Sequence, residues 1–170
     1  MKRILFTLLI LSSVSRLQAQ SITKHPAVNE GSNTGSNLRL GLSINPGITL
    51  GRYGSTFVLG GELGLYKNLT STLEGTFSSG LTEFFYNYKD IQNDILIPVK
   101  AGVRYTVSRR LFVGAQAGVA FSTTDGGAYF IYSPSVGWKV SKQLDIGVKY
   151  DHFSNEPSVL GLNVTYRIDL

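Results

Sequence analysis

Apolar and polar residues alternate with a period of two along most of the chain from Leu38 to Leu170. This period places successive side chains on opposite faces of a β-strand. The closing segment shows it most clearly, since every second residue from Leu160 onward is apolar and the residues between are Gly, Asn, Thr, Arg and Asp. Eight segments share the pattern and are predicted to be strands: residues 38–44, 57–65, 69–77, 95–105, 111–121, 130–140, 144–150 and 160–170.

The connections between these segments alternate between short turns and longer loops. The short ones read "YKNLTS", "VSRRL" and "VSKQL", and the last two look like one hairpin unit used twice. The longer ones read "GRYGS", "SSGLTEFFYNYKDIQND", "STTDGG" and "FSNEPS". Short turns at one end and long loops at the other are typical of an antiparallel up-and-down barrel. Pro46, Pro98 and Pro134 fall inside predicted strands, where we expect bulges.

Alternation alone leaves open which face of the barrel is outside, because a soluble lipid-carrying barrel also alternates. The polar face here is mostly Gly, Ser, Thr and Asn with few charges, which suits a narrow lumen better than a solvated exterior. The charged share of the chain, 16%, is below the roughly 25% of soluble domains. We therefore predict an all-β fold, an eight-stranded antiparallel up-and-down transmembrane β-barrel. A soluble periplasmic lipid carrier, whose apolar face would line a cavity, is a further alternative.

Charged residues on the polar face nearly balance, with six bases against five acids. A buried charge without a partner carries a desolvation penalty of several kcal/mol, so an enclosed lumen requires such a balance. The predicted lumen charge network consists of Arg39, Glu62, Glu74, Lys100, Arg104, Lys139, Asp145, Lys149, Asp151, Arg167 and Asp169.

Tyrosines and phenylalanines gather near the ends of the predicted strands, and we interpret them as girdles at the two membrane interfaces. An aromatic core of a soluble sheet is the alternative, and the cluster near residue 85 also fits an outer loop used for adhesion. The residues concerned are Tyr66, Tyr105, Phe121, Tyr150 and the cluster Phe84, Phe85, Tyr86 and Tyr88.

The first 19 residues are predicted to be a secretory signal peptide, because Lys2 and Arg3 precede an apolar run and "LQA" supplies a small residue for cleavage. Residues 20–37 are predicted to be a flexible segment and residues 38–170 the barrel. Removing the signal takes away three bases and leaves 13 against 11 acids, so charge gives little support to a nucleic-acid partner. With no Cys and two widely spaced His, we expect no disulfide, metal site or cofactor.

A family resemblance rests on the signal ending "QAQ", the eight alternating segments, the phrase "ILIPVKAGVRY" and the closing "VTYRIDL". With these features, residues 38–170 resemble the small outer-membrane β-barrel family of Gram-negative bacteria, of the OmpA-transmembrane or OmpX-like type. Leu170 departs from the pattern, since that family usually ends in Phe.

The resemblance implies a monomer in the cell outer membrane with an envelope structural or surface-interaction role. Its expected partners are outer-membrane lipids, lipopolysaccharide and, through the C-terminal strand, the barrel assembly machinery. An eight-stranded interior is only wide enough for side chains to fill it, so a general pore is not expected.

The stretch "HFSN" carries the one further candidate for chemistry. It resembles outer-membrane lipid A 3-O-deacylases of the PagL type, eight-stranded barrels with His-x-Ser-Asn near the end of the penultimate strand. That resemblance implies Ser154 as the nucleophile, His152 as the general base and Asn155 as an oxyanion donor. Residues 152 and 154 continue the lipid-facing series of their strand, on the side where acyl chains lie.

A complete triad also needs an acid, and the lipid-facing positions of the last predicted strand contain none. Glu156 is the only nearby carboxylate of matching parity. Two functions therefore follow from the sequence. The first is a non-enzymatic outer-membrane barrel, and the alternative is a lipid A deacylase-like serine hydrolase using Ser154 and His152.

Overall fold

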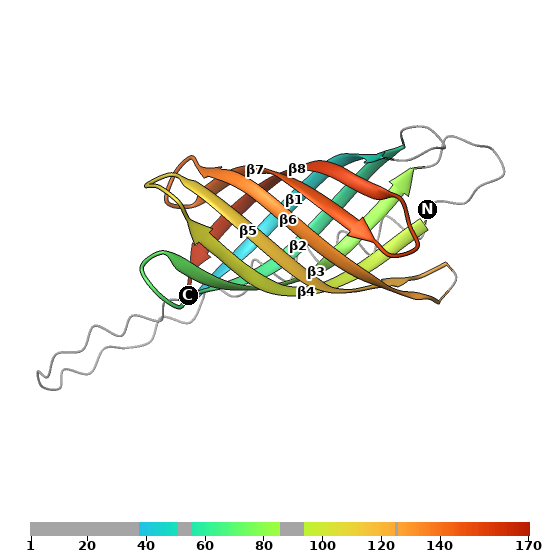
Figure 1. Ribbon diagram of the computed structural model, residues 1–170, viewed down its shortest axis with the longest axis horizontal. Coiled ribbons are helices and arrows are strands. Elements are labelled where there is room, and N and C mark those ends of the chain that lie inside the picture. The colour runs from blue at the N-terminus through green and yellow to red at the C-terminus, as the bar shows by residue number, and fades with distance from the viewer. Residues whose placement is uncertain (1–37, 51–55, 86–93, 125) are drawn as a thin grey trace, which may run out of the picture. The chain divides into compact units, whose positions relative to one another are not determined.

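The computed structural model describes residues 38–50, 56–85, 94–124 and 126–170, so the predicted signal peptide and flexible segment lie outside the described residues. The described chain is all-β, and Figure 1 shows its strands inclined to the long axis of the barrel. The strands are β1 (Leu38–Leu50), β2 (Phe57–Asn68), β3 (Leu73–Phe85), β4 (Asp94–Thr106), β5 (Leu111–Ser122), β6 (Ala128–Lys139), β7 (Leu144–Phe153) and β8 (Ser158–Asp169).

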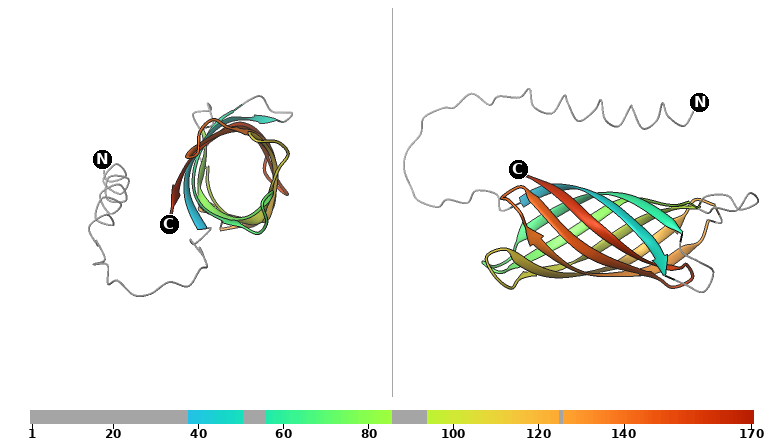
Figure 2. Two further views of the ribbon diagram at one scale, coloured as in Figure 1. Left: turned by 90° about the vertical axis from the view of Figure 1, so that its left-hand side faces the viewer. Right: turned by 90° about the horizontal axis from the view of Figure 1, so that it is seen from above.

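Each strand pairs antiparallel with its sequence neighbours, and β8 pairs with β1 to close the barrel. Figure 2 shows the closed ring from one end. A circuit of paired residues that starts at Leu40 reaches His152 on β7. The β7–β8 register, continued by one residue past Asp151, places Ser158 opposite His152, and Ser158 pairs with Leu50 on β1, ten residues beyond Leu40. Such a stagger inclines the strands by about 35–45° and leaves an interior just wide enough for side chains.

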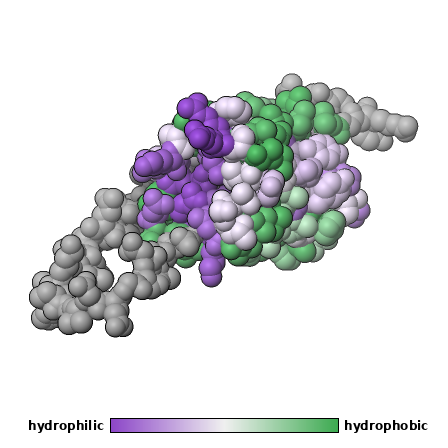
Figure 3. Space-filling model, turned by 60° about the vertical axis from the view of Figure 1, so that its left-hand side comes forward, coloured by the Kyte–Doolittle hydropathy of each residue, from purple (hydrophilic) through white to green (hydrophobic). Residues whose placement is uncertain are grey.

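Apolar side chains cover the outer wall of the barrel. Along β2 the residues alternate strictly between exposed and buried as far as Tyr66, with Leu59 and Leu63 outside and Glu62 inside. Figure 3 shows hydrophobic side chains over the wall and hydrophilic ones gathered toward one end. An apolar exterior around a polar lumen confirms the transmembrane barrel and contradicts the soluble carrier, which needs the opposite arrangement.

No helix among the described residues is long and apolar enough to cross a membrane.

The prolines inside strands interrupt one ladder each without shifting its register. Pairing of β1 with β8 stops at Ile44 and resumes at Gly47 in the same alignment, on either side of Pro46. The ladders at Pro98 and Pro134 show the same two-residue interruption. A bulge inserts a residue and so changes the register, which makes the expectation of bulges wrong. Each ladder simply lacks the donor that proline cannot supply.

Side chains in the lumen span two of these three interruptions. Asn163 Nδ2 donates to Asn45 Oδ1 at 2.6 Å across the gap between β1 and β8. Ser133 Oγ donates to Asp151 Oδ1 at 2.5 Å across the gap between β6 and β7. Hydrogen bonds between side chains therefore join strands where the backbone ladder does not.

The turns after β2, β4 and β6 share one hydrogen-bond pattern. In each, the first amide donates to the carbonyl of a Leu four positions later, at 2.8–2.9 Å. The hydroxyl of the second residue, which is Thr70, Ser108 or Ser141, accepts from the amide of that same Leu at 3.0–3.2 Å. The hairpin unit that the sequence predicts twice therefore occurs three times, since Thr70 forms the same bond as the two serines.

The outer aromatic residues agree in part with the predicted girdles. Tyr105, Phe121 and Tyr150 lie on the outward series of their strands. Phe85 also packs with the outward Phe57, with ring centroids 5.7 Å apart. These side chains stand near the strand ends, where aromatic rings meet lipid headgroups.

Tyr66 and Phe84 correct the girdle interpretation, because both are buried inside the barrel. Their even positions put them on the inward series of β2 and β3, so parity overrides the preference of aromatic residues for the interface. Tyr86 and Tyr88 lie outside the described residues.

The strands approach so closely at Gly102 that only glycine fits there. Comparison with a glycine that has open space around it tests this packing. A Cβ at this position would overlap the carbonyl oxygen of Ala115 on β5, whereas a Cβ at the lipid-facing Gly61 would meet nothing within 4 Å. Gly102→Ala is expected to lower the free energy of unfolding by about 1–3 kcal/mol, the usual cost of overpacking. Urea unfolding in lipid vesicles measures it. Gly61→Ala is the control, and equal losses in both variants would contradict the assignment.

Candidate functional site

The lumen is filled in three layers from the turn end to the loop end. β7 passes through all three, with Asp145, then Lys149 and Asp151, then Phe153 facing inward. The turn-end cluster comprises Arg39, Glu74, Arg104, Asp145 and Arg167, and the middle cluster comprises Glu62, Lys100, Lys149 and Asp151. The third layer, the apolar seal, comprises Val58, Phe84, Leu96, Ala120, Tyr129, Ile131, Phe153 and Val159.

Asp145 and Glu74 hold the turn-end cluster together from opposite strands. Arg104 Nη1 donates to Asp145 Oδ2 at 2.6 Å, and Arg167 Nη2 donates to Asp145 Oδ1 at 3.0 Å. Arg167 Nη1 also donates to Glu74 Oε1 at 3.3 Å, and Arg39 pairs with the same oxygen. Planar guanidinium groups suit this bridging, because each presents several donors in a fixed geometry.

Two aromatic rings enclose the guanidinium of Arg104. Its Cζ lies 4.9 Å from the ring centroid of Tyr66 and 4.0 Å from that of Phe112. The rings fit because their strands and neighbours carry glycine: a Cβ at Gly41 would overlap Tyr66, and one at Gly137 would overlap Phe112. The arrangement adds cation–π attraction to a charge that is already desolvated.

The middle cluster is neutral, with two lysines and two carboxylates. Glu62 Oε1 accepts from Lys100 Nζ at 2.9 Å and from Lys149 Nζ at 2.6 Å. Lys149 Nζ also lies 3.0 Å from Asp151 Oδ2. Asn45 Nδ2 donates to the same Glu62 oxygen at 3.1 Å. Because β2, β4 and β7 contribute the charged partners, these bonds cross the lumen and fix its width.

A cavity of about 30 Å³ lies between the two charged clusters. This volume is enough for two or three water molecules, which need roughly 10–15 Å³ each. Its polar lining includes Glu62, Tyr66, Arg104, Gln116, Lys149 and Asn163. Among the described residues, no group of three or more His, Asp or Glu side chains is arranged to hold a metal ion.

The apolar seal closes the lumen at the loop end. Phe84 and Phe153 are at most 1% exposed and meet edge to face, with ring centroids 6.0 Å apart. The alternation predicted a polar lumen throughout, so this apolar layer differs from the prediction. A signal was present on β6, where Tyr129 and Ile131 are apolar on the inward series while their neighbours are apolar on the outward series.

Nine of the eleven charges predicted for the lumen network take part in ion pairs within the two clusters. Lys139 and Asp169 stand apart from them at the turn end. Lys139 is half-buried and its Nζ donates to Thr106 Oγ1 at 2.9 Å. Asp169 is exposed, and no described residue forms an ion pair with it. The parity of both residues is inward, but the lumen ends before it reaches them.

The motif residues lie at the loop end of β7. His152 is half-buried on the outward face, beside Tyr132 at 4.8 Å between ring centroids. Its Nδ1 is hydrogen-bonded at 2.8 Å to the hydroxyl of Ser158, on β8. Ser154 and Asn155 are exposed just beyond the strand, and the amide of Ser154 donates to the carbonyl of Phe130 at 3.0 Å.

The serine that the structure brings to His152 is therefore Ser158, which the sequence analysis did not single out. Among the described residues, Ser158 is the hydrogen-bond partner of this histidine, and no carboxylate contacts it. Glu156, the acid of matching parity, is half-buried in the connection to β8. Only the pairing of β7 with β8 reveals the neighbour, because Ser158 lies six residues along the chain.

No family model matches the chain, and no curated protein matches it. Solved structures do. The designed barrel TMB2.3 aligns over 82% of this chain and all of its own length, with 19% identity and a TM-score of 0.57. Neisserial surface protein A aligns over 79% and 98% of the two chains, with 12% identity and a TM-score of 0.56. Ail, the attachment invasion locus protein of Yersinia pestis, aligns over 77% and 96%, with 13% identity and a TM-score of 0.52.

At such low identity the likeness concerns the fold. It confirms the predicted small transmembrane β-barrel.

Charge balance in the middle cluster is testable through Glu62. Glu62→Gln leaves two buried lysines with Asp151 alone and is expected to lower the free energy of unfolding by about 3–5 kcal/mol. Urea unfolding in vesicles measures the loss. The control is Asp169→Asn, which removes an exposed carboxylate and should change stability little.

A second variant distinguishes charge imbalance from lost packing. Glu62→Gln combined with Lys100→Met restores neutrality and should recover part of the stability. No recovery in the double variant would contradict the charge-balance explanation.

Proposed function

We propose that this protein is a non-conducting barrel of the outer membrane with an envelope structural or surface-interaction role. The observation that carries the proposal is the filled lumen, in which the apolar seal lies above two layers of ion-paired side chains. A solute would have to displace buried rings and separate buried charges to pass. The interior thus offers no path for transport. Any functional contact would therefore be made by the outer surface or by the two ends of the barrel.

The C-terminal strand supports the proposed contact with the barrel assembly machinery. Its outward residues Tyr166 and Ile168 are exposed, as is Leu170 directly after the strand, and together they continue the apolar alternation. Closure of β1 on β8 leaves no free strand edge, and this favours a monomer surrounded by outer-membrane lipids and lipopolysaccharide.

The hydrolase alternative has less support. His152 contacts Ser158 and not Ser154, and no described acid fixes the tautomer of its ring. Without such an acid an imidazole is a weak general base. We therefore favour the non-enzymatic role over the hydrolase, and lipid A deacylation is the reaction to be tested.

Electrical recording tests the closed lumen. Refolded protein in planar bilayers is expected to give no steady current above that of the bare bilayer, because buried rings and ion pairs fill the interior. Heat-modifiable gel mobility and protease protection would verify insertion, so that an absence of current caused by failed insertion is not mistaken for a closed lumen. A stable, reproducible conductance from the inserted protein would contradict the proposal.

Mass spectrometry of lipid A tests the enzymatic alternative. Cells expressing the wild type are expected to show the same lipid A as cells without it, and the same as cells expressing Ser154→Ala, Ser158→Ala or His152→Ala. Loss of one 3-linked acyl chain in the wild type, restored by His152→Ala, would instead establish the hydrolase. Comparison of the two serine variants would then identify the nucleophile.

A further inference from the structure

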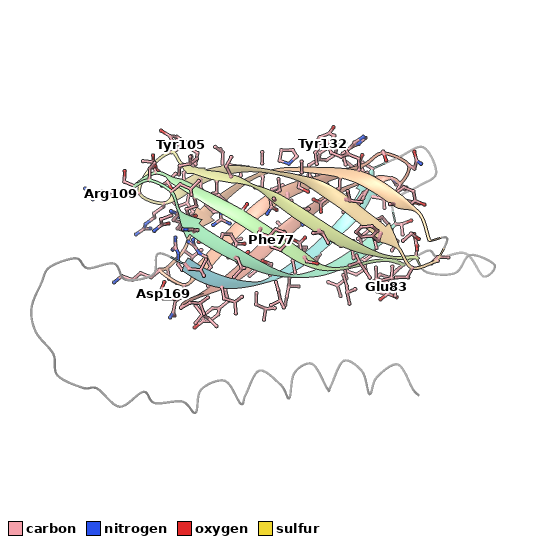
Figure 4. The ribbon with its side chains drawn as sticks, turned by 90° about the horizontal axis from the view of Figure 1, so that it is seen from below. Phe77, Glu83, Tyr105, Arg109, Tyr132 and Asp169 are labelled. Atoms are coloured by element: carbon pink, nitrogen blue, oxygen red, sulfur yellow. The ribbon has the colours of Figure 1, made fainter. Side chains whose placement is uncertain are left out.

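Charge is segregated along the axis of this barrel. The exposed bases Lys67, Arg109, Arg110 and Lys142, which we call the basic rim, belong to the turn end. At the loop end the described charged residues of the strands and connections are acidic: Glu83, Asp94 and Glu156. Figure 4 shows Arg109 and Asp169 at one end and Glu83 at the other. Apart from the exposed Asp169 at the turn end, the charges of the described residues named here therefore differ in sign between the two ends.

The basic rim is not neutralised within the described chain. No described carboxylate forms an ion pair with Arg109, Arg110 or Lys142, in contrast to the arginines of the turn-end cluster. Their turns are held by backbone and hydroxyl bonds, such as the amide of Leu111 donating to Ser108 Oγ at 3.2 Å. The charged side chains are thus not needed to form the turn and are available to a partner.

Apolar and aromatic residues show that this rim stands where lipid meets water. The first residues of the three short turns, Leu69, Val107 and Val140, are 54%, 52% and 51% exposed. Just inside them, Tyr105, Trp138 and Tyr166 face outward and are 49%, 48% and 46% exposed. Such rings occupy the headgroup region of a bilayer. The bases that follow them in the turns therefore lie beside lipid headgroups.

We propose that the basic rim binds anionic phospholipid headgroups in the leaflet that the turns face. Each Lys or Arg near a membrane surface attracts negative headgroup charge, and guanidinium groups bind phosphate oxygens through paired donors. A zwitterionic headgroup offers the same phosphate but no net charge. The inference rests on the proposed membrane-spanning function, and it adds a lipid class that this end of the barrel selects.

The lone tryptophan reports on this site directly. Trp138 is the only Trp of the chain and lies opposite Leu111, the first residue of β5, which directly follows the turn that carries Arg109 and Arg110. The amide of the next residue, Lys139, donates to the carbonyl of Arg110 at 2.7 Å. Lipids that gather at the basic rim will therefore be in contact with this indole ring.

Quenching of Trp138 by brominated acyl chains tests the proposal. The refolded full chain is placed in vesicles of phosphatidylcholine and phosphatidylglycerol, with bromine on one lipid class at a time. For the wild type we expect the anionic lipid to be favoured about fivefold over its mole fraction at low salt, the factor that one charge–headgroup attraction gives. The preference should fall when salt is raised, because exposed charges are screened.

The matched variants are Arg109→Gln/Arg110→Gln/Lys142→Gln at the rim and Glu83→Gln at the loop end. The triple variant is expected to lose the preference while it still inserts, and Glu83→Gln is expected to keep it. Equal quenching by both lipids in the wild type, or an unchanged preference in the triple variant, would overturn the proposal.

Two further outcomes separate this inference from its premise. If neither brominated lipid quenches Trp138, the barrel is not in the bilayer and the proposed function itself fails. If lipids are not discriminated but the detergent-solubilised wild type sediments with peptidoglycan and the triple variant does not, the rim binds the cell-wall polymer and the lipid proposal is overturned.

Discussion

Complete pairing of the backbone is the constraint on which the rest of this structure depends. A chain that crosses a membrane with strands must satisfy every amide and carbonyl inside the sheet, and closure of β1 on β8 is how it does so. Closure at a stagger of ten residues then sets the diameter, and the diameter decides that side chains must fill the lumen. The prolines do not disturb this closure, because the strand register is the same on both sides of each missing donor.

A filled lumen inverts the usual distribution of charge in a protein. The exterior can hold almost no charge where it meets lipid, so the charges of the strands lie inside, where they must neutralise each other. The middle cluster does this with two lysines and two carboxylates. The turn-end cluster has three arginines and two carboxylates, which leaves one positive charge in excess. The rings around Arg104 stabilise this charge, and so does the nearby open end of the lumen.

The sequence was sufficient to predict the barrel and nine of the eleven lumen charges, because both follow from the period-two alternation and the composition of the polar face. It was insufficient wherever the outcome depended on neighbours across strands. Tyr66 is of a residue type that favours the membrane interface, but its position in β2 points it into the lumen. Glycine at position 41 leaves room there for its ring. The apolar seal was not predicted because its eight side chains come from seven strands, and only β6 contributes two of them. Ser158 was missed for the same reason, since only strand pairing places it beside His152.

The charges at the two ends of the barrel can differ because the charges inside the lumen already pair with one another. Once the lumen has neutralised the charges that face it, the lysines and arginines of the turns have no partner left in the described chain. At the opposite end the apolar seal separates the charged layers from the loops, so the interior imposes no charge requirement there either. The interior therefore does not fix the charge of either end, and the exposed bases of the turns and the half-buried acids of the loop end differ in sign. In the non-conducting barrel that we propose, such differences at the rims are where selectivity can reside.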